Sequence, residues 1–340
     1  MNLRFTTPEP EQMQDLLSVT LRQVHGADSQ LEDWSAHPVS KRGKHRAVRY
    51  DLDARLAGAP HTRRYQWVGK FYEHDDDAGR VAAVLRQLTV TNGPARGGLV
   101  IPRLFAYHAP FHLLLLGYEP GESVTAALAR DPASVLPAIG HAVAALHTKP
   151  IAFDGITSPA VVLDDLRQRI ADLSDRIPGK ASPLRHMLGK LERRAPFLSA
   201  APSFLHGDLG PVQLRWQMGR IVVLDFDKWT RGDPALDLGN LLTQLRRLTL
   251  RKPGKLPHFA CLRQGILDAY QHWTAPDPGL TERVAWYEQT MLLRKIHFLA
   301  SDTTRHDEAE AIRERQAEAT HLVEELFALL ESGTSPKLEA

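Results

Sequence analysis

Ser203-Phe-Leu-His-Gly-Asp-Leu-Gly-Pro-Val-Gln-Leu214 opens the stretch that decides the fold, and Ile-Val-Val-Leu-Asp225-Phe-Asp227 follows shortly after it. The pattern of each segment predicts a short apolar strand that ends in a turn with an acidic residue. These residues, Asp208 and Asp225, stand seventeen positions apart. One such carboxylate can accept a proton from a hydroxyl group while the other holds a metal ion on phosphate groups, which is the division of roles that phosphoryl transfer requires.

The same stretch continues with Arg231-Gly-Asp233-Pro-Ala-Leu-Asp237-Leu-Gly-Asn240. Acidic residues near turns often do no more than cap helices, and this simpler reading applies to each of them taken singly. Their combined order, with apolar strands between them, favours a catalytic site over a set of caps.

Length, charge and cysteine content limit the classes of protein to which this chain can belong. The 340 residues are enough for two domains or one large bilobal domain, and the net charge of +2, from 42 basic and 40 acidic residues, argues against a nucleic-acid binder. Cys261 is the single cysteine, so an intrachain disulfide and a cysteine-based zinc site are excluded. The N-terminal residues lack the pattern of a signal peptide, and the apolar run at 113–116 is too short to span a membrane. We expect a cytoplasmic protein that does not bind membranes.

Hydrophobic periodicity divides the chain. A capped helix is predicted at the start, with Thr7 as its cap and Pro8 in its first turn. Strand-like alternation then runs from Leu31 to Tyr72, followed by a helix opened by Asp75 and two more strands, at 99–107 and 111–118. Beyond them the patterns are mostly helical, at 133–146, 162–173, 183–194, 236–248, 261–273, 280–300 and 308–330.

This order predicts an α+β protein with a small antiparallel sheet lobe, a larger helical lobe and a cleft between them. The predicted boundaries are residues 1–118 for the nucleotide-binding N-lobe, 119–122 for the hinge, 123–332 for the helical C-lobe and 333–340 for a tail.

His206-Gly-Asp208, with Gln213 five residues later, resembles the catalytic loop of the aminoglycoside phosphotransferase and choline kinase-like family, which shares the protein kinase fold. The resemblance implies that Asp208 is the catalytic base and that Asp225 binds the metal. Gln213 stands where this family usually has asparagine, so it would supply the second metal ligand through a similar carbonyl oxygen, one methylene further out. His206 and Asp227 belong to the two motifs as supporting residues.

The segment from Asp233 to Asp237 matches the motif that follows in this family, and the resemblance implies that these two acids brace the catalytic loop. Lys70, in Val68-Gly-Lys-Phe-Tyr, matches the strand lysine that holds the α- and β-phosphates of ATP. A solvated strand lysine is the alternative reading.

Two features of the family are poorly matched. The glutamate that usually pairs with the lysine falls at Val81, and no acid occurs between Asp77 and Glu119, so Asp77 or an acid of the run from Glu73 is the nearest replacement. The nucleotide loop falls at 37–46 with a single glycine.

Two further segments of the sequence are candidates for binding the nucleotide. Lys41 and Lys44 of the nucleotide loop could contact phosphates by charge, although a solvated basic loop explains them equally well. The backbone of Gly117, Tyr118 and Glu119 is expected to bind the adenine.

The sequence therefore predicts a small-molecule kinase that uses ATP, with GTP as an alternative, and Mg²⁺. Its acceptor would be a hydroxyl group of a metabolite, sugar or antibiotic, chosen by helices near 162–176 and 282–297. We expect a monomer or a weak homodimer. The runner-up is a pseudokinase that binds nucleotide without turnover, favoured by Val81 and the poor glycine loop. A pure interaction protein is hard to reconcile with Lys70, Asp208 and Asp225 occurring together.

Overall fold

The structure is a computed structural model, and its described residues are 7–40, 45–90, 98–152, 155–176, 179, 181–196, 202–301, 313, 317, 318 and 320–324. The chain divides into two compact units. Unit 1 comprises Met1–Arg96, Val100–Gly121 and Val222–Asp227, and unit 2 comprises Gly97–Leu99, Glu122–Ile221 and Lys228–Ala340. The residues of the Asp225-Phe-Asp227 motif thus fold with the N-terminal sheet, although they follow the catalytic loop in the sequence.

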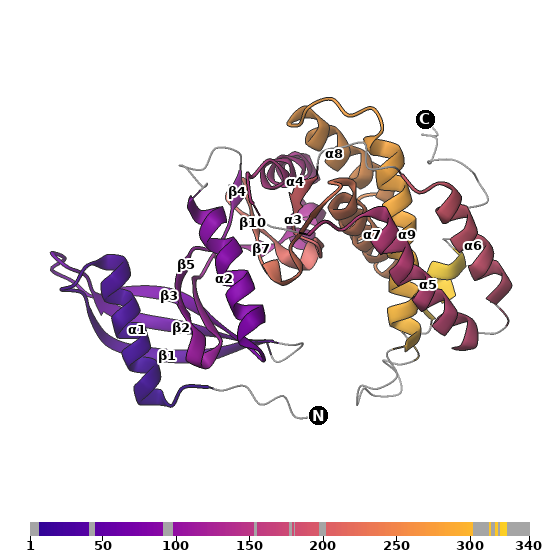
Figure 1. Cartoon of the computed structure of the whole chain (residues 1–340). Coiled ribbons are helices and arrows are strands. Elements are labelled where there is room, and N and C mark those ends of the chain that lie inside the picture. Colours follow the sequence, from indigo (N-terminus) through magenta and orange to yellow (C-terminus); the bar gives the residue numbers. More distant parts are fainter. Residues whose placement is uncertain are drawn as a thin grey trace. The chain divides into compact units, whose positions relative to one another are not determined.

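Unit 1 is built on a five-stranded sheet of order β1-β2-β3-β6-β5 (Figure 1). Its strands are β1 (Gln30–Ser40), β2 (His45–Arg55), β3 (Arg63–Tyr72), β5 (Leu104–His108) and β6 (Leu113–Gly117). Neighbouring strands are antiparallel, and the register sets Lys70 opposite Ala47 on one side and Leu114 on the other. The central position of β3 therefore holds Lys70 in the middle of the sheet.

Helix α1 (Pro10–His25) packs on this sheet (Figure 1). Its apolar residues recur at helical spacing, so Met13, Leu17 and Leu21 share one face and are buried in the same core as the aromatic side chains of β2 and β3. The predicted cap was wrong by two residues: Glu9 caps the helix, in a capping box closed by Gln12. The side chain of Glu9 accepts from the first turn while Gln12 reaches back to the backbone of Glu9, which satisfies two orphan amides at once.

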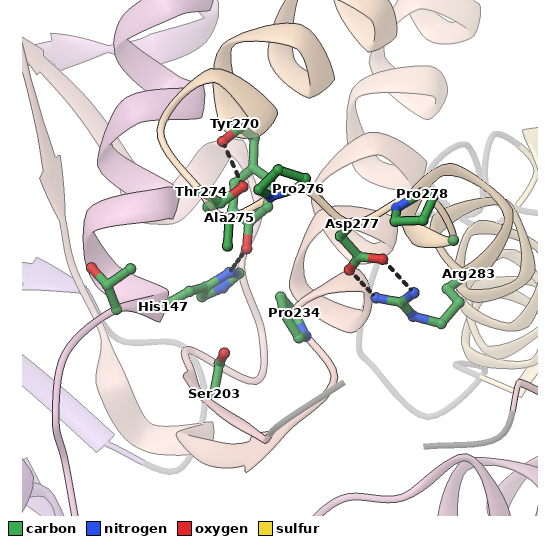
Figure 2. A pocket seen from close by; sticks show the side chains of 12 residues that line it. His147, Ser203, Pro234, Tyr270, Thr274, Ala275, Pro276, Asp277, Pro278 and Arg283 are labelled. Atoms are coloured by element: carbon green, nitrogen blue, oxygen red, sulfur yellow. Dashed lines mark hydrogen bonds and ion pairs between the residues drawn. The ribbon is translucent and has the colours of Figure 1, made fainter. Parts of the chain in front are cut away.

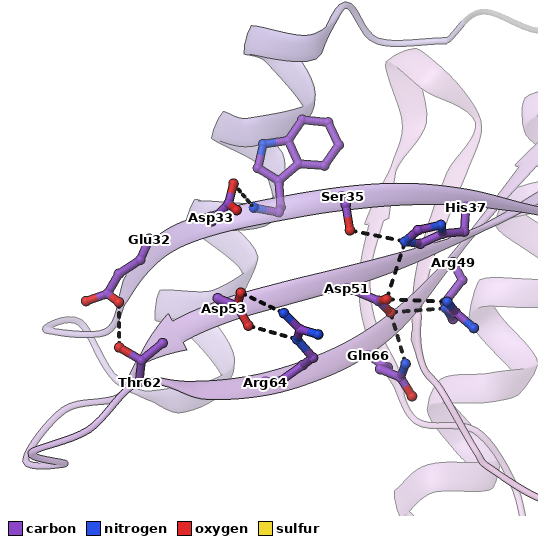
Figure 3. Close-up of polar contacts among 11 residues, drawn as sticks. Glu32, Asp33, Ser35, His37, Arg49, Asp51, Asp53, Thr62, Arg64 and Gln66 are labelled. Carbon is purple, nitrogen blue, oxygen red and sulfur yellow. Dashed lines mark hydrogen bonds and ion pairs between the residues drawn. The ribbon is translucent and has the colours of Figure 1, made fainter.

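A polar network covers the other face of the sheet in unit 1 (Figure 3). Asp51 accepts a hydrogen bond from Gln66 (3.0 Å) and forms ion pairs with Arg49 (3.0 Å) and His37 (3.4 Å), and Arg64 binds Asp53 through two nitrogens at 3.0 Å. Because side chains two residues apart share a face, this network lies on the face of β3 that carries Lys70. Such cross-strand pairs fix the register of the long strands.

Helix α2 (Asp75–Val90) follows β3 in unit 1, and the hydroxyl of Tyr107 on β5 donates to Asp75 at its N-terminus (2.6 Å). The predicted strand at 99–107 is two strands, β4 (Leu99–Val100) and β5, because residues 101–103 between them belong to neither strand.

Unit 2 is mainly helical. Its described helices are α3 (Val124–Arg130), α4 (Pro132–His147), α5 (Pro159–Arg176), α6 (Ala181–Arg193), α7 (Ala235–Arg251), α8 (Phe259–His272) and α9 (Leu280–Ser301). Helix α4 packs on α8, α5 packs on α6 and α9, and α7 packs on α9. At the last contact Gly239 lies so close that a β-carbon would stand 2.6 Å from Cβ of Tyr287. Glycine at this position therefore allows the two helix backbones to approach closely.

Short strands position the loops of unit 2. Strand β8 (Ser203–Leu205) pairs antiparallel with β11 (Thr230–Gly232), and β7 (Glu122–Ser123) pairs with β9 (Leu214–Gln217). The remaining strand, β10 (Arg220–Val223), belongs to a sheet of order β4-β10-β9-β7, and the division between the units falls within β4 and within β10.

The α+β prediction with an antiparallel sheet followed by helices is confirmed. The predicted helices up to residue 300 are present, and the sequence reading missed α3, β7, β9 and β11, which are too short for periodicity to identify. The predicted helix at 308–330 lies mostly outside the described residues. Among the helices of the described ranges, none combines the length and apolar character needed to cross a membrane.

Candidate active site

The loop that the sequence predicts to be catalytic begins where β8 ends in unit 2, and it is called the catalytic loop below. Gly207 has a φ of +80°, a conformation that glycine adopts without strain, and a β-carbon on it would lie 1.8 Å from the carbonyl oxygen of Lys228. The turn at this position can therefore be made only by glycine. It leaves His206 buried and exposes Asp208.

A buried carboxylate holds this turn. Asp237, in the first turn of α7, accepts hydrogen bonds from the backbone amides of His206 (2.6 Å, to Oδ2) and Gly207 (2.9 Å, to Oδ1), and Nε2 of His147 at the end of α4 lies 3.2 Å from Oδ2. Burial raises the pKa of the Asp237 carboxyl, but hydrogen bonds and the charges of His147 and His206 outweigh burial and lower the pKa below its usual value. The carboxylate is thus ionised and fully engaged at neutral pH.

Tyr270 extends this network. Its hydroxyl lies 3.0 Å from Nδ1 of His147, and both side chains are buried. Three helices, α4, α7 and α8, therefore meet at one hydrogen-bonded chain that ends on the backbone of the catalytic loop.

Asp233 has a different partner. It accepts from Arg283 on α9 (2.8 and 3.4 Å) and from the amide of Ala235 at the start of α7 (3.0 Å). The two acids that the resemblance grouped as braces are therefore divided: Asp237 contacts the loop directly, whereas Asp233 ties α7 to α9.

A pocket of about 510 Å³ in unit 2 lies next to His147 and Arg283, the side chains that bind Asp237 and Asp233 (Figure 2). His147, Pro234, Asp277 and Arg283 are among its lining residues. Arg283 is engaged by Asp277 (2.6 and 3.0 Å) as well as by Asp233, so its guanidinium is compensated by two carboxylates. The guanidinium of Arg283 therefore contributes no uncompensated charge to the pocket.

The carboxylate of Asp208 has a neighbour that the sequence reading quoted without assigning a role. The amide nitrogen of Asn240 on α7 lies 3.4 Å from Oδ1 of Asp208 and donates to the carbonyl oxygen of Leu209 (3.0 Å). Asn240 stands three residues after Asp237, so one turn of α7 carries both residues that contact the loop. That spacing was the signal that could have identified it.

Gln213 ends the short helix η3 (Pro211–Gln213) five residues after Asp208. Its side-chain oxygen is buried, and no described residue donates a hydrogen bond to it. A buried oxygen without a donor is costly unless a ligand satisfies it. The Oε1 atom of Gln213 is therefore available as a metal ligand, and an amide oxygen is of the hard type that Mg²⁺ prefers.

Unit 1 contains a second group of charged residues. The ammonium of Lys70 lies 2.5 Å from an oxygen of Asp225 and 2.5 Å from an oxygen of Asp227. The side chain of Lys70 is 9% exposed and that of Asp225 is 37% exposed, so the aspartate remains partly accessible while it pairs with the buried lysine. Asp225 has a φ of +68°, which is strained for a residue with a side chain and is tolerated best by short polar residues.

Tyr72 completes this group. Its hydroxyl donates to Asp227 (2.7 Å), and the ammonium of Lys70 lies 5.1 Å from the centre of its ring. Burial, followed by the charge of Asp227, raises the pKa of Tyr72 well above its usual value, so the phenol stays protonated. Val81 is buried in α2, and the partners of Lys70 come from the Asp225 motif rather than from Asp77.

The remaining predicted nucleotide contacts are only partly described. The amide of Gly117 donates to Arg103 (2.8 Å) and that of Tyr118 donates to Gln66 (3.1 Å), so a base would need other backbone groups of the 117–119 segment. Lys41 and Lys44 lie outside the described residues.

Removal of the buried brace should destabilise unit 2. We expect Asp237→Ala to lower the free energy of unfolding by about 3–5 kcal/mol, because two loop amides and His147 lose a buried charged partner. The pKa of Asp237 is lowered in the folded protein, so its contribution is present above its unfolded value of about 3.9 and is lost as the pH falls through the folded pKa. Urea unfolding at pH 7 and pH 3 measures both effects.

The exposed Asp268 on α8 provides the matched control for that measurement. Asp268→Ala should change stability by less than about 0.5 kcal/mol. An Asp237→Ala protein as stable as the wild type at pH 7 would refute the claim that Asp237 stabilises the loop.

A glycine turn that presents an exposed carboxylate, a buried brace beneath it and a strand lysine paired with a motif aspartate define a kinase-like phosphotransferase. The chain belongs to the phosphotransferase enzyme family, whose model matches residues 46–278, more than half of the sequence. It is a phosphotransferase with an alcohol group as acceptor. Comparison with curated proteins gives no match.

Solved structures share the fold. Choline kinase from Cryptosporidium parvum Iowa II superposes with a TM-score of 0.64 at 12% identity, over 94% of this chain and 97% of that one. A thermostable mutant of aminoglycoside phosphotransferase APH(4)-Ia, in a ternary complex with ADP and hygromycin B, gives 0.61 at 15% identity, over 94% and 99%. Amicoumacin kinase hAmiN in complex with AMP-PNP, Ca²⁺ and Ami gives 0.62 at 13% identity, over 93% and 94%. At these identities the likeness establishes the protein kinase-like fold.

Proposed function

We propose that this protein is a small-molecule kinase that transfers the γ-phosphoryl group of ATP to a hydroxyl group of a metabolite, sugar or antibiotic, with GTP as an alternative donor. The observation that carries the proposal is the catalytic loop: Asp237 holds its amides at 2.6 and 2.9 Å while the carboxylate of Asp208 remains exposed. Phosphoryl transfer depends mainly on positioning and charge, and a rigid loop with one exposed carboxylate supplies the positioning.

Asp208 is proposed as the catalytic base. Its carboxylate would accept the proton of the acceptor hydroxyl as that oxygen bonds to the γ-phosphorus, and the bond from phosphorus to the bridging oxygen of the β-phosphate breaks. The products are the phosphate ester and the nucleoside diphosphate. The amide of Asn240, 3.4 Å from Oδ1, would orient the carboxylate, because an amide can donate to it without competing for the substrate proton.

The residues present fit a magnesium ion. Asp225 offers a half-exposed carboxylate and Gln213 a buried oxygen without a donor among the described residues. Bound Mg²⁺ would neutralise charge on the transferred phosphoryl group. The described residues contain no group of three or more His, Cys, Asp or Glu that could hold a metal. Few protein ligands are typical of Mg²⁺, which usually keeps several waters and takes phosphate oxygens.

Lys70 is proposed to hold the α- and β-phosphates, and Asp227 and Tyr72 are proposed to position it. In many kinases a glutamate of the following helix has this role. Val81 occupies that place in the sequence, while Asp227 lies 2.5 Å from the Lys70 ammonium and is itself bound by the Tyr72 hydroxyl. The pair Asp227 and Tyr72 would keep Lys70 extended once its second partner, Asp225, turns to the metal.

The partner, oligomeric state and location of the enzyme also follow from the proposed function or from the sequence. The partner is expected to be a small hydroxylated molecule, with neither nucleic acid nor a membrane involved. The monomeric or weakly dimeric state and the cytoplasmic location remain predictions from the sequence.

Turnover of ATP without acceptor tests the proposal against a pseudokinase. Purified protein is expected to hydrolyse ATP slowly with Mg²⁺ or Mn²⁺ and not with EDTA, because water can replace the acceptor. Gln213→Ala should lower this rate by about tenfold or more, whereas Gln213→Asn should retain most of it, since only the asparagine keeps a carbonyl ligand. The measurement is release of the nucleoside diphosphate.

The matched control is Gln264→Ala, an exposed glutamine of α8 that should leave the rate unchanged. Binding of ATP without hydrolysis or transfer, combined with unchanged metal-dependent binding in Gln213→Ala, would establish the pseudokinase instead.

A further inference from the structure

Helices α5 and α9 of unit 2 carry a cluster in which two arginines share one carboxylate. Asp165 on α5 is shared by two guanidinium groups, Arg169 at 2.8 Å and Arg294 at 3.0 Å. Arg169 also contacts His297 (3.2 Å), which in turn binds Asp172 (2.8 Å). One carboxylate cannot neutralise both arginines, so the Asp165 site keeps a net positive charge.

Lys295 follows Arg294 on α9 and has no ion pair with any described residue. Its ammonium lies 4.1 Å from the centre of the Phe298 ring, and burial followed by the charge of Arg247 lowers its pKa to about 8. The nearby acid Glu318 is taken by Arg247 (2.6 Å) and Arg251 (3.7 Å). A partly desolvated ammonium without a carboxylate partner is unfavourable unless an anion accompanies it.

Arg294 and Lys295 belong to α9, which packs on α7, and α7 contacts the predicted catalytic loop. Gly239 packs against Tyr287, and Thr243 donates to the carbonyl oxygen of Glu288 (3.1 Å). Arg294 and Lys295 each stand seven residues beyond one of these contacts, which is two turns along the same face.

A second observation links the cations to the catalytic loop. The charge of Asp208 favours the protonated form of both Arg294 and Lys295, although burial is the larger effect and lowers the pKa of each. Asn240 on α7 contacts Asp208 directly. Helix α7, whose Asn240 contacts Asp208, packs on α9, which carries Arg294 and Lys295, so the proposed base and these cations belong to neighbouring segments of unit 2.

We propose that the acceptor carries a carboxylate or phosphate group besides its hydroxyl, and that Lys295, assisted by Arg294, binds this anion. The inference rests on the proposed function, since it names the substrate class of that site. A cationic acceptor would meet the excess positive charge of the Asp165 site and the ammonium of Lys295, and repulsion between like charges weakens binding. An anionic acceptor would pair with the Lys295 ammonium, which has no carboxylate partner among the described residues, and would bring its hydroxyl toward Asp208.

Two sets of matched acceptors test this proposal with Mg²⁺ and ATP. The first set is glycerol, glycerate, glycerol phosphate and aminopropanediol, and the second is glucose, glucuronate, glucose phosphate and glucosamine. Carboxylate and phosphate members should be phosphorylated with a higher kcat/KM than the neutral and ammonium members of the same set. Lys295→Gln should raise KM for the anionic members about tenfold or more and leave KM for neutral members within about threefold, whereas Lys295→Arg should retain the preference.

Lys255→Gln, which changes an exposed lysine after α7, is the control and should alter no member. The proposal is overturned if ammonium members are preferred, if Lys295→Gln affects all members equally, or if ATP is hydrolysed but no anionic member accepts phosphate.

A binding measurement separates this proposal from the proposed kinase activity. Calorimetry without nucleotide should detect binding of glucuronate or glycerol phosphate to the wild type and weaker binding to Lys295→Gln. Such binding in a protein that does not turn over ATP would refute the kinase activity alone, whereas absence of this binding would refute the anion site.

Discussion

Asp208→Asn is expected to lower kcat by about 10²–10⁴ while the fold and the binding of Mg²⁺ and ATP are retained. Asparagine has nearly the same shape as aspartate and can still accept the hydrogen bond from Asn240, but it can neither take up the hydroxyl proton nor attract it by charge. Steady-state phosphoryl transfer, or acceptor-free ATP hydrolysis, measures the loss. Thermal unfolding with and without nucleotide verifies that binding survives.

Asp268→Asn provides the control, because the exposed carboxylate of Asp268 contacts Gln264 on α8, outside the catalytic loop. It should leave kcat unchanged. Turnover of Asp208→Asn within a few-fold of the wild type would remove Asp208 from its role as the base.

Asp225→Ala is expected to abolish the part of nucleotide stabilisation that depends on magnesium. In the wild type, ATP should raise Tm more with Mg²⁺ than with EDTA, since a ligand that binds only the native state stabilises it according to its affinity. Without the half-exposed Asp225 carboxylate the two conditions should give the same small shift. Lys70 would keep Asp227 as its partner, so weak nucleotide binding should persist. Differential scanning fluorimetry measures the four shifts.

Two further variants make this experiment specific. Asp77→Ala removes an exposed acid of α2 and should leave the magnesium increment intact, because Lys70 pairs with Asp225 and Asp227. Asp227→Asn should weaken ATP binding in both conditions, since Lys70 loses its positioning partner. Equal shifts with and without metal in the wild type would argue against a kinase mechanism.

The sequence was most informative where function and local geometry are encoded in adjacent residues. The turn at Gly207 requires glycine, the acids that follow it stand at fixed spacings, and the apolar runs before them are too short for helices. One contiguous motif therefore predicted the candidate residues from His206 to Asp237. Unit 1 was predicted from alternation, because its strands bury one face against α1.

Partners distant in the sequence could not be predicted. Lys70 and Asp227 are 157 residues apart, and nothing in either segment indicates that the Asp225 motif folds with the sheet. The only sequence signal for Asn240 was its spacing of one helical turn after Asp237, because its contact with Asp208 depends on how α7 meets the loop. Lys295 carries no motif: its significance comes from the packing of α9 on α7 and from the absence of a carboxylate partner among the described residues.

Transfer of labelled phosphate tests the central claim most directly. The wild type is incubated with γ-labelled ATP, Mg²⁺ and the matched anionic and neutral acceptors, and the phosphate ester is quantified beside a reaction with Asp208→Asn. The account predicts label on an acceptor hydroxyl in the wild-type reaction, dependent on Mg²⁺ and reduced by about 10²–10⁴ in the variant. Label that remains entirely in ATP while ATP binds the protein, or equal transfer by the wild type and the variant, would contradict it.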